Sequence, residues 1–147
     1  MTGEVVMGCD IHTYTEVKKD GKWVMVSPYF TPECIGDHVY EARGAFDARN
    51  YRLFGILAGV RSNGPCMTKE PRGFPADASD SVKFEYEHWG PDAHTPSYVT
   101  LAELVAYRWD RSYVGDLVLT HVDDLKEWVT NGKFDYDDVR VVFWFDN

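Results

Sequence analysis

The sequence predicts an α+β domain in which a small, mainly antiparallel sheet, made of an N-terminal hairpin and a C-terminal strand, packs with three or four helices. Residues that favour strands lie near both ends of the chain, at 7–27 and 139–145, and segments with helical apolar spacing lie between them. The chain has 147 residues, of which 44% are hydrophobic and 15% aromatic. That is enough apolar surface for one core, so we expect a single domain over residues 1–147.

The hairpin is the first predicted unit. Residues 7–17 are rich in types that favour strands, and 22–27 follow as a second strand after the turn signal Asp20-Gly21. Alternation in the second strand places Trp23 and Met25 on one face. Residues 1–6 precede this unit and are expected to be an N-terminal extension. The prolines and glycines of 28–48 predict an irregular segment.

Two helices are predicted in the middle of the chain. Apolar residues recur at helical spacing over about 49–60, and a glycine- and proline-rich loop follows at 62–75. Asp77 or Ser79 is expected to cap a second, short helix through Glu87.

Two further helices are predicted before the last strand. Thr100 and Glu103 have the spacing of a capping box, which opens a helix through about residue 108. Apolar spacing predicts another helix over 121–130, and Asn131-Gly132 is a typical C-terminal stop.

Charge and composition exclude several classes of protein. The chain has 15 basic and 24 acidic residues, a net charge of −9, and the whole deficit lies in residues 76–147. Binding of polymeric nucleic acid requires neutralisation of many phosphates, so an acidic chain is a poor candidate for it. Six basic against two acidic residues within 43–75 remain compatible with a small anionic ligand. No apolar run is long enough to span a membrane, and we expect a cytoplasmic protein.

The first candidate site lies on the first strand. Asp10 and His12 are two residues apart and project from the same face, as one edge of a metal site or an acid/base pair would require. Gly8 allows a ligand or another part of the chain to approach closely. The alternative is that Asp10 forms a salt bridge with an arginine while His12 is a half-buried, hydrogen-bonded residue.

Arginines around the first helix are candidates for phosphate binding. Arg49, Arg52, Arg61 and Arg72 offer guanidinium groups that match phosphate oxygens, and Asn50 could contact a base or ribose. The alternative is that these arginines are solvated charges that pair with the acidic second half of the chain.

Residues 89–98 are predicted to be a polar loop ahead of the capped helix. Trp89 and Tyr98 could stack on a base. Asp92 and His94 of the same loop could complete a divalent metal site. The ligands of that site would be Asp10, His12, Asp92 and His94. Under that hypothesis Asp10, His12 and His94 are the candidate catalytic residues. The alternative is that the loop makes only turn hydrogen bonds and packing contacts.

Several of these segments resemble a known family. Small phage and prophage proteins that open with the motif MGCDIH are similar to this chain at Met7 to His12, Arg49 to Phe54, Leu57 to Arg61, Arg72 to Pro75, Asp92 to His94 and Tyr98 to Leu104. The resemblance implies a phage protein that acts in an infected bacterial host, and it implies no particular activity. The chain departs from the family where Thr95 and Pro96 replace a serine-rich stretch.

Three functions are compatible with these features. The leading hypothesis is a module that binds a small phosphate-bearing nucleotide and sequesters a signal of bacterial immunity. The first alternative is a metal-dependent phosphodiesterase, in which a divalent cation activates water to cleave such a nucleotide. The second alternative is an acidic inhibitor that binds a host protein. A homo-oligomer is compatible with each of them.

Overall fold

The computed structural model describes residues 8–26, 46, 48–132 and 134–147. The predicted extension 1–6 and nearly all of the predicted irregular segment 28–48 lie outside the described residues. The elements, in order, are β1 (Asp10–Lys19), β2 (Lys22–Val26), α1 (Tyr51–Ala58), α2 (Asp80–Trp89), the 3-10 turn η3 (Gly90–Asp92), β3 (His94–Thr100), α3 (Leu101–Ala106), α4 (Arg111–Val114), α5 (Asp116–Gly132), the 3-10 turn η4 (Tyr136–Asp138) and β4 (Val139–Asp146). The predicted α+β class is confirmed, with the N-terminal hairpin and the C-terminal strand in one sheet.

The four described strands form an antiparallel sheet in the order β2-β1-β4-β3. β4 is central and is buried along seven of its eight residues. Because both faces of a central strand are covered, its sequence is an almost continuous run of valine and aromatic residues rather than an alternation.

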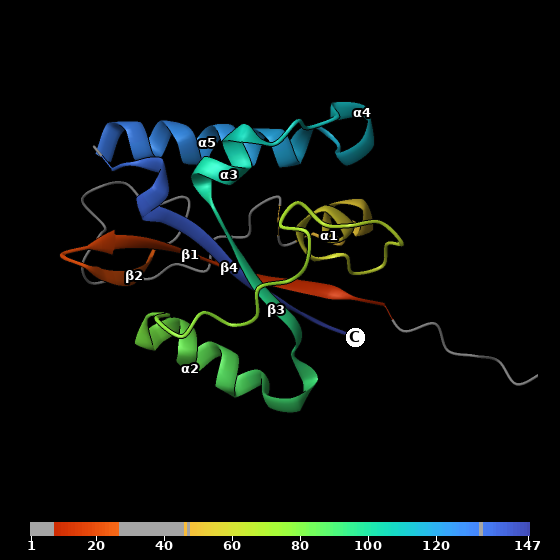
Figure 1. The fold of residues 1–147 in the computed structure, drawn as a ribbon, viewed down its shortest axis with the longest axis horizontal. Coiled ribbons are helices and arrows are strands. Elements are labelled where there is room, and N and C mark those ends of the chain that lie inside the picture. The colour runs from red at the N-terminus through yellow and green to blue at the C-terminus, as the bar shows by residue number, and fades with distance from the viewer. Residues whose placement is uncertain (1–7, 27–45, 47, 133) are drawn as a thin grey trace, which may run out of the picture.

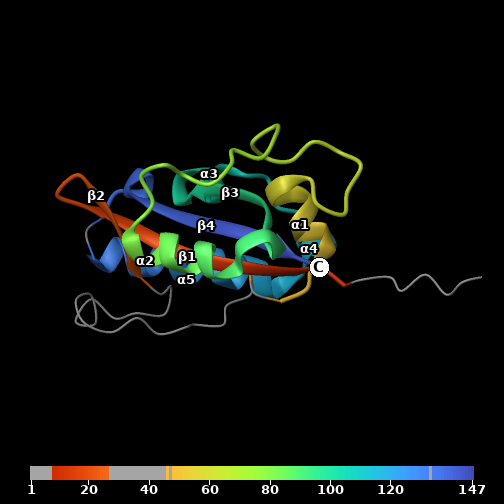
Figure 2. The same ribbon diagram turned by 90° about the horizontal axis from the view of Figure 1, so that it is seen from below.

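Helices cover both faces of the sheet, so the domain has three layers (Figures 1 and 2). The larger core lies on the face of Phe143 and Phe145 and is closed by apolar residues of α1, α3 and α5, among them Phe54, Leu104 and Leu125. On the opposite face α2 covers a smaller core around Val142 and Trp144. The alternation predicted for β2 is confirmed, since Met25 packs into this smaller core and Val26 into the larger one.

β3 replaces part of the predicted polar loop, and that prediction was wrong for residues 94–98. The strand tolerates Pro96 because it is an edge strand and because a bulge separates His94 from Ser97. Thr95 has a φ of 51° within this bulge, which is uncommon for a residue with a branched side chain. The proline and the polar residues interrupt the alternation of apolar residues from which a strand is predicted.

The predicted helix caps agree with the structure better than the predicted helix lengths do. Asn50 caps α1, and Gly59 closes it in the left-handed conformation with a φ of 71°, so α1 is shorter than the predicted 49–60. Ser79 caps α2, and the capping box of Thr100 opens α3. α4 was not predicted because a four-residue turn has no measurable periodicity, and α5 begins five residues before the predicted start at His121.

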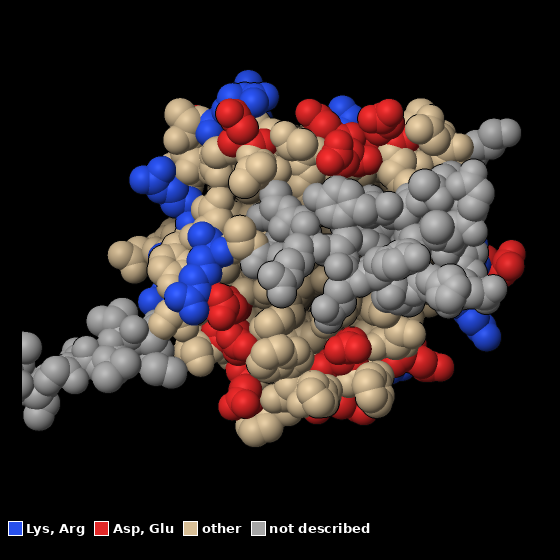
Figure 3. Space-filling model, turned by 180° about the vertical axis from the view of Figure 1, so that it is seen from behind, with Lys and Arg blue, Asp and Glu red and all other residues tan. Residues whose placement is uncertain are grey.

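Acidic side chains gather over both helical layers. In Figure 3 they lie along the upper and lower parts of the molecule, which correspond to the layers of α5 and α2, and a smaller basic group lies at the side between them. Exposed acidic residues of these two helices include Asp80, Glu87, Asp116, Asp123 and Glu127. Among the described residues, no helix combines the length and the apolar character needed to cross a membrane.

Candidate functional site

Asp10 and His12 project from the α2 face of β1, and each has its own partner within the chain. Arg49 donates to both carboxylate oxygens of Asp10, at 2.6 Å from Nε and 3.3 Å from one terminal nitrogen. Nε2 of His12 lies 3.0 Å from the Asp146 carboxylate, and its ring packs against that of Trp89 at an interplanar angle of 32°, with 4.1 Å between centroids. We call these five residues the sheet-end cluster.

The sheet-end cluster brings together residues from three candidate segments of the sequence, 10–12, 49–72 and 89–98, whose convergence the sequence left open. The hydrogen bond from Arg49 holds the pKa of the Asp10 carboxyl below its ordinary value. A Cβ added to Gly8 would lie 2.3 Å from the Arg49 guanidinium. The close approach predicted at Gly8 is therefore made by a side chain of this protein, which agrees with the structural alternative for Asp10.

The four predicted metal ligands do not meet. His94 stacks on Phe145, with 6.0 Å between the ring centroids. Phe145 belongs to the larger core, whereas His12 lies on the other face of the sheet. Asp92 is exposed at the end of η3. In the part of the chain that the structure describes, no group of three or more His, Cys, Asp or Glu residues is arranged to hold a metal ion. The sequence could not anticipate this, because the bulge in β3 decides where His94 lies.

Arg72 lies in a third place and ties its loop to α3. Its guanidinium donates to both carboxylate oxygens of Glu103, at 2.7 and 2.5 Å, and to the carbonyl of Tyr98 at 3.0 Å. It also lies over the Tyr98 ring at 5.2 Å. The Arg72 hydrogen bond holds the pKa of Glu103 below its ordinary value. Arg72 and Tyr98, predicted as a phosphate contact and a base-stacking residue, thus contact each other.

Asn50 and Arg61 are also engaged within the chain. The Asn50 side chain accepts from the backbone N–H of Leu53 at 3.1 Å and donates to the carbonyl of Val114 at 2.9 Å. Arg61 lies over the ring of Tyr51, 5.1 Å from its centroid. Asn50 therefore fixes the end of α1 against α4, which is a structural role.

A buried ionic network was missed by sequence reasoning. Arg140 is 3% exposed and donates to Glu16 at 2.7 Å and to Asp77 at 2.9 Å, and its guanidinium lies 4.0 Å from the Trp23 ring centroid. Glu16 is fully buried and also accepts from the backbone N–H of Ser79 at the start of α2. Through these hydrogen bonds and ion pairs the network joins the start of α2 to β1 and β4. A charged residue within an apolar strand was a signal for it, but its partners follow only from the register of the sheet.

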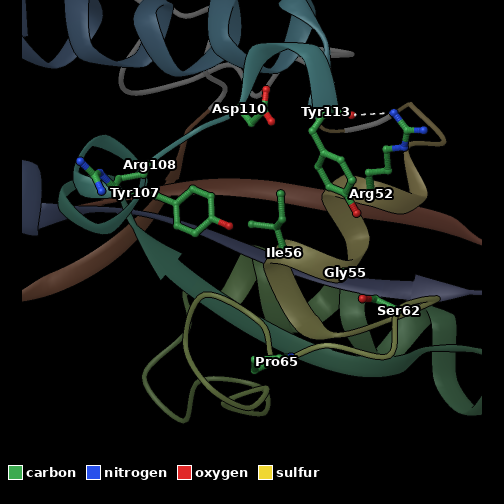
Figure 4. A pocket seen from close by; sticks show the side chains of 9 residues that line it. All are labelled: Arg52, Gly55, Ile56, Ser62, Pro65, Tyr107, Arg108, Asp110 and Tyr113. Atoms are coloured by element: carbon green, nitrogen blue, oxygen red, sulfur yellow. Dashed lines mark hydrogen bonds between the residues drawn. The ribbon is translucent and has the colours of Figure 1, made fainter.

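A cavity of about 230 Å³ lies between α1 and the segment from the end of α3 to α4 (Figure 4). We call it the α1–α4 cavity. Its walls are Arg52, Ile56, Tyr107, Arg108, Asp110 and Tyr113, with Gly55, Ser62 and Pro65 along one edge. The close-up shows the rings of Tyr107 and Tyr113 on either side of Ile56, and the two arginines at opposite ends.

The two arginines of the α1–α4 cavity differ in how they are held. Arg52 donates to the carbonyl of Tyr113 at 3.2 Å and lies over its ring at 5.0 Å, which leaves further N–H groups of its guanidinium for a ligand. Arg108 makes no hydrogen bond or ion pair with the residues that the structure describes. The guanidinium of Arg108 is therefore more accessible to an anion than that of Arg52.

Only Arg52 of the predicted site residues lies in this cavity. Four further cavity residues come from one short segment of the chain, namely Tyr107, Arg108, Asp110 and Tyr113. The sequence predicted a helix through about residue 108 and no element in the rest of this segment. The density of aromatic and charged residues between 107 and 113 was a signal, but their approach to α1 depends on the packing of distant helices.

No protein-family model matches the chain, and no curated protein or solved structure matches it either.

Proposed function

We propose that the protein binds a small, phosphate-bearing nucleotide in the α1–α4 cavity and releases it chemically unchanged. The observation that carries this proposal is the pairing of two tyrosine rings with two guanidinium groups around one cavity. Aromatic rings stack on bases, and guanidinium groups match phosphate oxygens through paired hydrogen bonds.

The size of the cavity limits the ligand. Pockets for small molecules usually measure about 300–1,000 Å³, and this cavity measures about 230 Å³. A mononucleotide with part of its surface left in solvent is the largest nucleotide compatible with that volume. Arg52 and Arg108 at the two ends favour a ligand whose negative charge lies at the rim.

The resemblance of the chain to MGCDIH phage proteins supplies a biological setting for this proposal. Sequestration of a nucleotide signal would give a phage an advantage against bacterial immunity. Binding alone suffices for that function.

Isothermal titration calorimetry with AMP, GMP, CMP and UMP tests the proposal. We expect binding of at least one nucleotide, and Arg108→Ala to weaken it about ten- to a hundredfold, because a hydrogen bond to a charged group contributes about 1.5–3 kcal/mol. Arg111→Ala is the matched control: Arg111 lies on α4, does not line the cavity, and forms an exposed pair with Asp116.

Native mass spectrometry of the same mixtures shows whether the ligand keeps its mass. Absence of binding by all four nucleotides, equal effects of Arg108→Ala and Arg111→Ala, or a product of altered mass would each contradict the proposal.

A further inference from the structure

The α1–α4 cavity carries one negative group as well as two positive ones. Asp110 lines it next to Tyr113 and caps α4. Its Oδ1 accepts from both the backbone N–H and the hydroxyl of Ser112, at 3.0 and 2.6 Å. These bonds lower the pKa of the Asp110 carboxyl, with the Ser112 side chain as the largest cause. The group is therefore ionised at neutral pH and can only accept hydrogen bonds.

An ionised carboxylate restricts which part of a ligand can lie beside it. It repels phosphate and accepts from hydroxyl or amino groups. Since Ser112 occupies Oδ1, the second carboxylate oxygen remains for a donor from the ligand. The phosphate must lie away from Asp110, and Arg108, which has no partner among the described residues, offers it a position.

The two tyrosine rings determine which part of the nucleotide lies between Arg108 and Asp110. Tyr107 and Tyr113 border the middle of the cavity, on either side of Ile56 (Figure 4). A base against either ring leaves the sugar of a nucleotide between the base and its phosphate. In a ribonucleotide that sugar presents two hydroxyl donors, and in a dideoxynucleotide it presents none.

We infer that the ligand is a ribonucleotide, held with its phosphate on Arg108 and its ribose hydroxyls on Asp110. This inference rests on the proposed function and adds the sugar to it. The Asp110 carboxylate is exposed, so the discrimination comes from the hydrogen bonds that the ribose hydroxyls donate to a charged acceptor, which an analogue without those hydroxyls does not form.

The test compares the tightest-binding ribonucleoside monophosphate of the four with its 2′,3′-dideoxy counterpart. We expect the dideoxynucleotide to bind at least tenfold more weakly to the wild-type protein. In Asp110→Asn the ratio of the two dissociation constants should fall below threefold, since the amide replaces an acceptor by a donor. Asparagine is also a good helix cap, so α4 is retained.

Asp116→Asn is the control, because Asp116 is an exposed carboxylate on α5 outside the cavity. It should leave the tenfold discrimination unchanged. Equal binding of the two nucleotides by the wild-type protein, or unchanged discrimination in Asp110→Asn, would overturn the ribose contact and leave the proposed function standing. If none of the four ribonucleotides binds, the proposed function fails and this inference fails with it.

Discussion

Acid should destabilise the fold through one buried histidine on α5. His121 is 3% exposed and packs edge-to-face on Phe46, with 4.2 Å between ring centroids. Burial lowers its pKa from 6.5 to about 4. The unfolded chain therefore takes up a proton at a higher pH than the folded chain does. The stability that the neutral ring contributes is complete above about pH 6.5 and is lost as the pH falls from there to about 4.

The two pKa values give the size of this loss. With 6.5 in the unfolded chain and about 4 in the folded one, linkage predicts a loss of about 1 kcal/mol at about pH 5.5 and about 2–3 kcal/mol at about pH 4.5. These are substantial fractions of the stability of a small domain, which is about 5–15 kcal/mol.

Urea unfolding of the wild-type protein and of His121→Leu at three pH values measures the effect. Carboxylates titrate over the same range in both proteins, so the difference between their free energies of unfolding isolates the histidine. That difference should move by about 2–3 kcal/mol in favour of the leucine variant between about pH 7.5 and about pH 4.5. A difference that stays constant with pH would refute the assignment of a buried, neutral His121. His121→Gln provides a second variant if leucine packs poorly.

Three further substitutions test the fold. Arg140→Leu should lower the free energy of unfolding by about 3–5 kcal/mol, because it leaves Glu16 buried without its ionic partner; urea unfolding measures this, and recovery is expected when Glu16→Leu is added. Gly59→Ala should cost about 1 kcal/mol, since Gly59 has a φ of 71° at the end of α1; an unchanged unfolding midpoint would contradict this. Thr100→Ala should also cost about 1 kcal/mol by removing the capping box of α3, and Thr100→Ser should restore most of it.

Much of the fold could be predicted because its signals are local. The Asp20-Gly21 turn, the Ser79 cap and the capping box of Thr100 each depend on residues within a few positions of one another, and the structure contains all of them. β3 was missed because the bulge and Pro96 interrupt its pattern. That strand is stabilised by its pairing with β4, which local sequence does not encode.

The candidate site was less predictable than the fold. The residue types expected for phosphate binding were arginines, and the structure does place Arg52 at the α1–α4 cavity. Arg49 and Arg72 instead pair with Asp10 and Glu103. The sequence does not show whether the guanidinium group of an arginine pairs with a carboxylate of its own chain or remains accessible to a ligand. Only the positions of distant acidic residues distinguish the two cases.

Composition and short-range spacing are sufficient to specify the α+β class, the hairpin, the helix caps and the acidic balance of the second half. Which polar groups meet depends instead on how distant segments pack. Asp10 pairs with Arg49 across 39 positions, Glu16 with Arg140 across 124, and His12 with Asp146 across 134. Strand register and helix packing set these contacts, and the same packing brings Arg108 and Asp110 to α1. Local patterns carry no information on such long-range distances, so the cavity emerges only when the chain is folded.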